Sequence, residues 1–422
     1  MCDAATIALV GIGGYGSIYV SALLDANGKA PQHRFVAAVD PFPTLCDRLE
    51  ELRGRQVPIY PTLQALYENH RPELVVISSP FHLHASQTIE ALAHGSHVLC
   101  EKPMCVTVRQ AEQMRRARDR AERQVAIGYQ WSFSPAIQRL KNDIQQNVFG
   151  AAKRLKTLVL WPRDETYYSR NRWAGKQRDE QGNPIFDSPV SNACAHYLHN
   201  MFYVLGEATD RSAAPLRVSA ELYRAHPIEN YDTAALRCRT DRGAEILFVV
   251  SHATRQSRGP EFRYEFEKAV VSFSEREGGE IVATFADGTR RSYGSPWESS
   301  DTGKLWSTLR AIRSQTPTVC GIEASVAQTQ VLTAAQDSMP SPLPFPATLV
   351  RVEGEVGSRK TWVEGLEDAL ARSYEEFRLP SELNVSWGRA GRAIDVVPWR
   401  GGGDGGSSAG GVGKTRQAKL AS

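Results

Sequence analysis

Short apolar, β-prone runs alternate with amphipathic stretches over residues 5–130. This rhythm is typical of parallel strands joined by helices, so it predicts a doubly wound α/β domain. The expected strands span residues 5–10, 35–39, 74–78, 97–100 and 125–129. The expected helices span residues 19–24, 45–52 and 85–94.

The pattern changes near Ala151, beyond which longer runs alternate apolar and polar residues. Such alternation indicates strands with one face against a core, as in an antiparallel sheet. The expected strands span residues 153–160, 217–223, 245–250 and 263–273, and the expected helices span residues 190–205, 324–338 and 361–377. We therefore predict two α/β domains. Residues 1–130 bind a dinucleotide, and residues 131–399 bind substrate and other subunits through a large, mostly antiparallel open sheet.

Residues 400–422 form a glycine-rich tail with almost nothing apolar to bury, which predicts disorder. Gly413-Lys414-Thr415 resembles the end of a phosphate-binding P-loop. Ser408, however, occupies the first glycine position of that motif, and no predicted strand precedes it. We therefore interpret the segment as part of the tail.

Composition narrows the class of protein. The chain has 422 residues, of which 41% are hydrophobic, and its 50 basic and 47 acidic residues leave a net charge of only +3. That balance gives no reason to expect nucleic acid or a membrane as partner. The seven cysteines are scattered, and no apolar run approaches the ~20 residues of a membrane span. The first apolar run, residues 6–10, is too short for the apolar region of a signal peptide. We expect reduced thiols and a cytoplasmic protein.

A glycine-rich loop directly follows the first predicted strand and opens a helical stretch. Gly11 permits a tight turn, Gly13 lets the backbone approach a pyrophosphate, and Gly16 lets the helix pack closely on the strand. The helix N-terminus would offer N–H groups and partial positive charge to the phosphates. This is the fingerprint of a Rossmann dinucleotide site.

An acidic residue ends the second predicted strand. Asp40 follows the glycine loop at about the ~20-residue spacing expected for a carboxylate that binds ribose hydroxyls. A carboxylate there would repel a 2′-phosphate, and Pro41-Phe42-Pro43 supplies no arginine to receive one. The sequence therefore favours NAD, with NADP second.

Two further motifs carry a family resemblance that covers roughly residues 5–390. Ser78-Ser79-Pro80-Phe81-His82-Leu83-His84 and the strand-end tripeptide Glu101-Lys102-Pro103 resemble the glucose-fructose oxidoreductase, inositol dehydrogenase and rhizopine-catabolism family, Gfo/Idh/MocA. The resemblance implies that Lys102 lies near the nicotinamide and the reacting hydroxyl, that a cis bond precedes Pro103, and that the protein is a homodimer or homotetramer. The residues expected to contact the cofactor are Gly11, Gly13, Gly14, Tyr15, Gly16, Asp40, Ser79, Pro80, His84, Glu101 and Lys102.

The family's second motif places an aspartate four residues before a histidine on a helix, and His196 matches the histidine. Ser188 and Pro189 would cap and begin this helix, so that Asn192 and His196 share one face. Asn192 departs from the family's aspartate, and asparagine can orient an imidazole but cannot supply charge. Either His196 is a weaker base and Lys102 does more of the work, or Asp187 or another acid takes the missing role.

An aromatic and basic segment precedes that helix, with Trp161-Pro162-Arg163 followed by residues 167–176. Aromatic faces pack on sugar rings, and basic side chains donate to hydroxyls or a carboxylate. A solvated loop or a subunit interface would look the same in sequence. The expected catalytic residues are Lys102, His196 and Asn192, and those expected to bind substrate are Lys102, Arg163, Arg172, Trp173, Asn192, His196 and, ranked lower, His199.

These motifs predict an NAD-dependent oxidoreductase that moves hydride between a secondary alcohol of a sugar, sugar derivative or cyclitol and the nicotinamide. Two alternatives stay open. Oxidation could be transient and lead to cleavage of a glycosidic bond, or the protein could be a non-catalytic NAD-bound sensor. No metal site is expected, because the pairs His82, His84 and His196, His199 lack a third ligand at suitable spacing.

Overall fold

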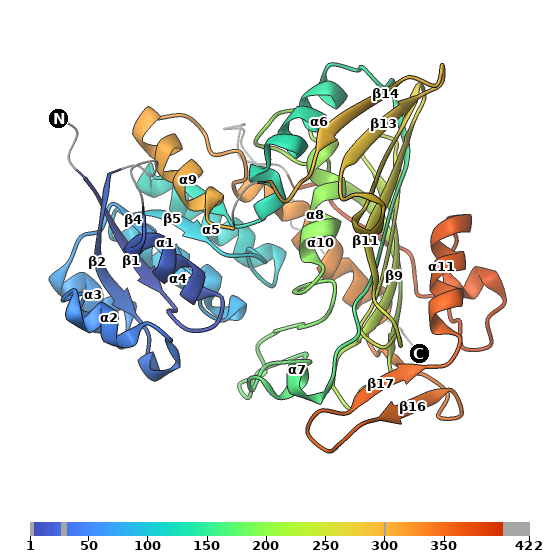
Figure 1. Cartoon of the computed structure of the whole chain (residues 1–422), viewed down its shortest axis with the longest axis horizontal. Coiled ribbons are helices and arrows are strands. Elements are labelled where there is room, and N and C mark those ends of the chain that lie inside the picture. The colour runs from blue at the N-terminus through green and yellow to red at the C-terminus, as the bar shows by residue number, and fades with distance from the viewer. Residues whose placement is uncertain (1–3, 27–31, 299–300, 400–422) are drawn as a thin grey trace, which may run out of the picture.

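A computed structural model describes residues 4–26, 32–298 and 301–399 of the chain. It contains a parallel sheet near the N-terminus and a larger mixed sheet, which Figure 1 shows at opposite sides of the molecule with helices between them. The predicted disordered tail, residues 400–422, lies outside the described residues. Among the described helices, none is long and apolar enough to cross a membrane.

The first sheet has six parallel strands in the order β3-β2-β1-β4-β5-β6, the order of a Rossmann fold. Its central strands are buried on both faces and are rich in valine, leucine and isoleucine, as parallel strands covered by helices must be. The strands are β1 Ala5–Val10, β2 His33–Val39, β3 Ile59–Tyr60, β4 Leu74–Ile77, β5 His97–Cys100 and β6 Val125–Ile127.

Helices cover both faces of this sheet. Those that follow its strands are α1 Gly16–Leu24, α2 Leu49–Gly54, α3 Leu63–Asn69, α4 His84–Ala93 and α5 Val108–Ala121. A sixth helix, α9 Gly303–Ser314, comes from much later in the chain, yet its Leu305 and Leu309 pack in the same apolar core as β1. Helix α9 thus lies within the predicted second domain in sequence, residues 131–399, but packs against the first sheet.

The second sheet has ten strands, and only β10 with β7 and β15 with β8 pair in parallel. This confirms the predicted α/β class with a large, mostly antiparallel second sheet. The strands are β7 Ala152–Leu160, β8 Pro215–Arg224, β9 Thr233–Thr240, β10 Glu245–Ser251, β11 Arg258–Phe266, β12 Ala269–Ser274, β13 Ile281–Phe285, β14 Arg290–Gly294, β15 Leu343–Pro344 and β18 Ile394–Asp395. A separate hairpin joins β16 Val350–Glu353 to β17 Lys360–Val363.

The second sheet is covered unequally. Helices α8 Ala195–Val204 and α10 Ile322–Ser338 lie between it and the first domain, and α11 Leu366–Glu376 lies on the far face (Figure 1). Most positions around α10 are buried, as expected of a helix enclosed by neighbours. The remaining helices are α6 Pro135–Gln145 and α7 Glu165–Ser169, and the 3₁₀ turns are Pro43–Leu45, Phe81–Leu83, Gln130–Phe133, Glu275–Glu277 and Pro380–Leu383.

Several predicted boundaries were wrong. The predicted strand 263–273 is two antiparallel strands, β11 and β12, because the N–H groups of Glu267 and Lys268 bond to residues outside the β11–β12 ladder. The predicted helix 361–377 begins only at Leu366, since residues 360–363 pair in β17. The predicted helix 45–52 is divided into a 3₁₀ turn and α2.

Candidate functional site

The glycine loop between β1 and α1 is close-packed. Gly11 has φ +83°, and a Cβ atom there would lie 2.8 Å from the carbonyl oxygen of Ser78. A Cβ atom on Gly16 would lie 2.0 Å from the carbonyl oxygen of Gly11. Any other residue at either position would therefore displace the loop from the end of the sheet.

The start of α1 is suited to an anion. Its first turn holds no acidic residue and no side chain caps it, so the dipole and N–H groups of the helix end face no competing carboxylate from within the helix. Gly14, at φ +54°, would place a Cβ atom in open space, and Tyr15 is 40% exposed beside it. Gly13 packs against Leu45 at the same loop.

Asp40 lies where the second strand ends and contacts the glycine loop directly. Its Oδ2 accepts a hydrogen bond of 3.0 Å from the Ile12 N–H, and its Oδ1 accepts one of 2.8 Å from the Phe42 N–H. Each carboxylate oxygen has a second lone pair, which is free to accept from a ribose hydroxyl. The loop, the helix end and the acid together fit an adenine dinucleotide with a free 2′-hydroxyl.

His84 joins the two loops that carry the family motifs. Its Nδ1 lies 2.8 Å from the carbonyl oxygen of Pro103 and its Nε2 lies 3.0 Å from that of Ser79. The ring is 1% exposed, and burial lowers its pKa. The buried His84 ring therefore connects the two loops through their backbone carbonyl groups. Pro80, in contrast, is exposed. The peptide bond between Lys102 and Pro103 is cis, as the resemblance implied.

Lys102 reaches across to the second domain. Its Nζ donates to the backbone oxygen of Asn192 at 3.0 Å and to Oδ1 of the same residue at 3.4 Å. Removal from water lowers the pKa of Lys102, and the positive charge of Lys304 lowers it further against the opposing effect of Glu101. The amine thus lies between the two sheets with amide oxygens as its partners.

Asn192 connects Lys102 to a buried carboxylate. Its Nδ2 donates to Oδ1 of Asp187 at 3.1 Å, and Oδ2 of Asp187 accepts from the Gly175 N–H at 2.7 Å. Asp187 is 2% exposed, and burial raises its pKa although Arg170 lies 3.8 Å away. The predicted alternative acid is therefore present, one amide group away from Lys102.

The predicted helical face shared by Asn192 and His196 was wrong. Residues 189–194 form consecutive turns, and α8 begins only at Ala195 after Cys194. The Ser191 hydroxyl donates to the Phe186 carbonyl at 2.7 Å and accepts from the Ser188 N–H at 3.0 Å. Ser188 Oγ does accept from the Ser191 N–H at 3.2 Å, but it caps these turns and not α8, whose N-cap is Cys194.

His196 lies in the first turn of α8, near Lys102. Its ring meets that of Tyr129 edge-on with centroids 5.8 Å apart, and its Nδ1 is buried with no hydrogen-bond partner among the described residues. Burial, followed by the positive charge of Lys102, holds the pKa of His196 well below 6.5. The imidazole is therefore neutral at pH 7 and able to accept a proton.

His199 has a different environment from His196. It is 1% exposed, its Nε2 lies 2.8 Å from the Ser132 hydroxyl, and its ring stacks on Tyr129 with centroids 3.9 Å apart. These contacts give it a packing role on the buried side of α8. We therefore remove it from the residues proposed to touch substrate.

The aromatic and basic segment lies at the junction of the domains. The Trp173 ring meets the Phe81 ring edge-on with centroids 5.2 Å apart, and the Arg170 guanidinium lies 3.7 Å from the centroid of Tyr167. Arg163 also contacts Tyr167, at 4.9 Å, whereas Arg172 is exposed. The segment thus connects the motif around Phe81 to the second sheet.

Sequence reasoning missed Lys304, which α9 brings beside the Glu-Lys-Pro tripeptide. Its Nζ lies 2.5 Å from Oε1 of Glu101, which also accepts from the Tyr19 hydroxyl at 2.5 Å. Nζ donates in addition to the Tyr15 hydroxyl at 3.0 Å. Burial disfavours the charge of Lys304, yet Glu101 and Tyr15 raise its pKa overall. A lysine in an ordinary amphipathic stretch offers no signal of this role.

The side chains of the described residues form no cluster of three or more histidine, cysteine or acidic groups placed to hold a metal ion. The six described cysteines, Cys46, Cys100, Cys105, Cys194, Cys238 and Cys320, are buried free thiols.

Comparison with known proteins identifies the first domain. Residues 5–129 match the model of an oxidoreductase family with an NAD-binding Rossmann fold. Over these residues the chain is similar to the Gfo/Idh/MocA family. For residues 5–129 the match supports the resemblance carried by the glycine loop and the Glu-Lys-Pro tripeptide, and it confirms the NAD-binding Rossmann fold.

Gfo/Idh/MocA relatives with curated descriptions match only part of this chain. The rhizopine catabolism protein MocA of Rhizobium meliloti is 32% identical over 147 residues, which cover 34% of this chain and 43% of that protein. The chain spans less than half the length of the first curated relatives it matches, at 43%, 44% and 33%.

Solved structures extend the similarity to the second domain. The WlbA dehydrogenase of Bordetella pertussis, in complex with NADH and UDP-GlcNAcA, has a TM-score of 0.68 at 22% identity, covering 82% of this chain and 100% of that one. Levoglucosan dehydrogenase, in complex with NADH and levoglucosan, has a TM-score of 0.66 at 16% identity, covering 80% and 97%. At these identities the likeness establishes the two-domain fold alone.

Proposed function

We propose that this protein catalyses NAD-dependent hydride transfer between a secondary alcohol of a sugar, sugar derivative or cyclitol and the nicotinamide. The observation that carries the proposal is the meeting of Lys102 with Asn192 and His196. An amine from the first domain lies 3.0 Å from the turn that precedes α8, and a neutral imidazole follows in the next turn of the chain. These are the groups that alcohol oxidation requires beside a nicotinamide.

NAD would be held by the glycine loop and the end of α1, with Asp40 on the adenosine ribose and Ser79, Pro80 and Glu101 along the carboxyl edge of the first sheet. When bound, the nicotinamide supplies the acceptor for the hydride. Preference for NAD over NADP follows from Asp40, because its carboxylate would face a 2′-phosphate with like charge.

Lys102 and His196 divide the handling of the proton. The Lys102 ammonium donates a hydrogen bond to the reacting oxygen and stabilises negative charge on it as the C–H bond breaks. His196, neutral at pH 7, accepts the hydroxyl proton. Asn192 orients the amine, and Asp187 orients Asn192 through the 3.1 Å hydrogen bond between them. Arg163, Trp173 and Arg172 complete the proposed substrate contacts.

A panel of sugars, sugar acids and cyclitols, followed with NAD and NADP by the absorbance of reduced nicotinamide, tests the proposal. We expect turnover with NAD, and its loss in Lys102→Ala and His196→Ala. Lys153→Ala, which changes an exposed lysine of β7, is the matched control. A sensor would bind NAD in calorimetry without turnover, and free aglycone without NADH would indicate transient oxidation. Absence of both NAD binding and turnover would refute the proposed function.

We further propose a homodimer or homotetramer, which light scattering of the purified chain measures directly. The cytoplasm is the proposed compartment, since it keeps thiols reduced and the six described cysteines are free.

A further inference from the structure

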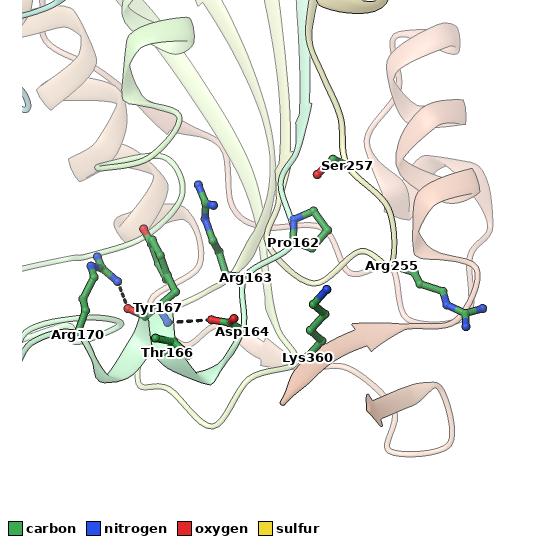
Figure 2. A pocket seen from close by; sticks show the side chains of 9 residues that line it. All are labelled: Pro162, Arg163, Asp164, Thr166, Tyr167, Arg170, Arg255, Ser257 and Lys360. Atoms are coloured by element: carbon green, nitrogen blue, oxygen red, sulfur yellow. Dashed lines mark hydrogen bonds between the residues drawn. The ribbon is translucent and has the colours of Figure 1, made fainter. Parts of the chain in front are cut away.

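A cavity of about 610 Å³ opens at the end of the second sheet, below the domain junction. Four of its lining residues are cations, namely Arg163, Arg170, Arg255 and Lys360, and one is an acid, Asp164. Figure 2 shows the lining residues, which come from α7 and the residues beside it, from the segment after β10 and from β17. Its volume lies within the range of small-molecule sites.

The positive charge of this cavity is only partly neutralised by the protein. Arg255 has an ion pair of 3.4 Å with Glu353, and the Asp164 side chain accepts from the Tyr167 N–H at 3.0 Å. Arg170 pairs with Asp187 at 3.8 Å. Arg163 makes no ion pair with any described residue, and its Nε is buried with no hydrogen-bond partner among them. A buried guanidinium N–H without an acceptor is rare in proteins, so the charge of Arg163 is not offset by the protein around it.

Aromatic contacts hold the two innermost cations in place. The Tyr167 ring lies 4.9 Å from the Arg163 guanidinium and 3.7 Å from that of Arg170. In Figure 2 the side chains of Arg163 and Tyr167 lie beside each other and point in the same direction, away from Lys360. Stacking of this kind positions a guanidinium without neutralising it. Arg170 also donates to the Tyr167 carbonyl oxygen and lies near Asp187, so Arg163 has the less committed guanidinium of the two.

The cavity adjoins the proposed reaction site. Arg170 lies 3.8 Å from Oδ2 of Asp187, whose other oxygen accepts from Asn192, the partner of Lys102. The positive charges of Arg163 and Lys102 both lower the pKa of the Cys194 thiol against the larger effect of burial, so both lie near the same turn. A substrate whose alcohol lies at Lys102 can therefore extend toward these arginines.

We propose that this cavity binds a carboxylate or phosphate group of the substrate, with Arg163 as the principal donor and Arg170 as its neighbour. The substrate is then an anionic sugar derivative and not a neutral sugar or cyclitol. This inference rests on the proposed function for its substrate, but the anion site itself is open to a binding test. A forked guanidinium matches the oxygens of either anion, and each charge-assisted hydrogen bond adds affinity.

The test is calorimetry on the full chain with saturating NAD and four probes: D-glucose, D-glucuronate, D-glucose 6-phosphate and inorganic phosphate. We expect at least one anionic probe to bind tenfold or more tightly than glucose. A preference for glucuronate indicates a carboxylate site, and a preference for the two phosphates indicates a phosphate site. Weakening of the preferred probe as sodium chloride rises would follow from screening of the arginines.

Variants assign the site to its residues. Arg163→Gln should lose about 10- to 100-fold in affinity for the preferred anion, as expected for removing a hydrogen bond to a charged group. Arg163→Lys, which keeps the charge but not the fork, should lose less. Arg290→Gln, an exposed arginine of β14, is the control and should not change. Circular dichroism establishes that each variant is folded.

The proposal is overturned if none of the anionic probes binds more tightly than glucose, or if folded Arg163→Gln and Arg170→Gln keep the full preference. These outcomes are separate from failure of the proposed function. Anion binding that depends on Arg163 without NADH formation would retain the site and reject the dehydrogenase, whereas turnover of neutral sugars alone would do the reverse.

Discussion

Lys102 and Lys304 both lie beside Glu101, yet their surroundings shift their pKa values in opposite directions. Lys304 has a carboxylate 2.5 Å away and a raised pKa despite being 1% exposed. Lys102 is partly buried, faces amide oxygens of Asn192 and has a lowered pKa. The surroundings thus stabilise the charged form of Lys304 and destabilise the charged form of Lys102.

The difference lies in the partner. A carboxylate stabilises the ammonium form, whereas an amide oxygen accepts its hydrogen bond without offsetting its charge. The Lys102 ammonium therefore stays free to stabilise negative charge on a substrate oxygen. Lys304 pairs with Glu101, whose Oε2 accepts from the Lys102 backbone N–H at 3.1 Å and so positions the loop that carries Lys102.

The largest effect should come from replacing Lys102, and it should lower catalytic activity. Lys102→Ala should lower kcat/KM by about 10³-fold, because the developing charge on the alcohol oxygen loses its donor. The melting temperature should change little, since its partners are amide oxygens that water can satisfy. Steady-state kinetics and thermal unfolding measure both. Retained turnover in folded Lys102→Ala would place the chemistry elsewhere.

The next largest effect should come from replacing Lys304, and it should lower the free energy of unfolding. Lys304→Met leaves Glu101 buried without its cation, which typically costs about 3–5 kcal/mol of unfolding free energy. Urea unfolding measures this loss. Adding Glu101→Gln to Lys304→Met should recover much of it, because the uncompensated charge is gone. A single variant as stable as the parent would contradict the structural role of the pair.

A third change should make the two lysines more alike. Asn192→Asp places a carboxylate beside Lys102, which should raise the pKa of Lys102 and of His196 by about one unit. If turnover needs charged Lys102 and neutral His196, activity is lost above the first pKa and below the second. Both limbs of the pH profile of kcat/KM should then move to higher pH. Asn192→Ala is the control without added charge. An unchanged pH profile in Asn192→Asp would contradict the claim that the partner at position 192 sets the pKa of Lys102.

The smallest effect should come from Tyr15, the exposed hydrogen-bond partner of Lys304. Tyr15→Phe removes the hydroxyl that accepts from Lys304 at 3.0 Å, but Tyr15 is 40% exposed and water can replace it. We expect a loss of about 0.5–1 kcal/mol in urea unfolding. A loss as large as that of Lys304→Met would mean that Tyr15, and not Glu101, holds the lysine.

Local patterns in the sequence predicted the parts of the site that depend on neighbouring residues. β1 and β5 have the predicted bounds, and Gly11 and Gly16 make the close approaches that their residue type implied. These features follow from side-chain periodicity and from the backbone conformations that glycine can adopt. Both signals are contained within a few consecutive residues. The roles assigned to Lys102, Asn192 and His196 remain proposals.

Other parts of the site depend on distant segments. Lys102 meets Asn192 across 90 positions, and Tyr15 meets Lys304 across 289. The delayed start of α8 and the burial of His199 likewise follow from packing around Ser191, Tyr129 and Ser132. No local pattern encodes such contacts.

The sequence by itself determined the type of domain that binds the dinucleotide, because strand periodicity and glycine conformation act locally. Only the tertiary structure decided which of two lysines is neutralised, which acid stands behind Asn192, and where Arg163 presents an unsatisfied donor. Those properties are set by burial and by the nearest charge, and both are defined only once the two sheets have packed together.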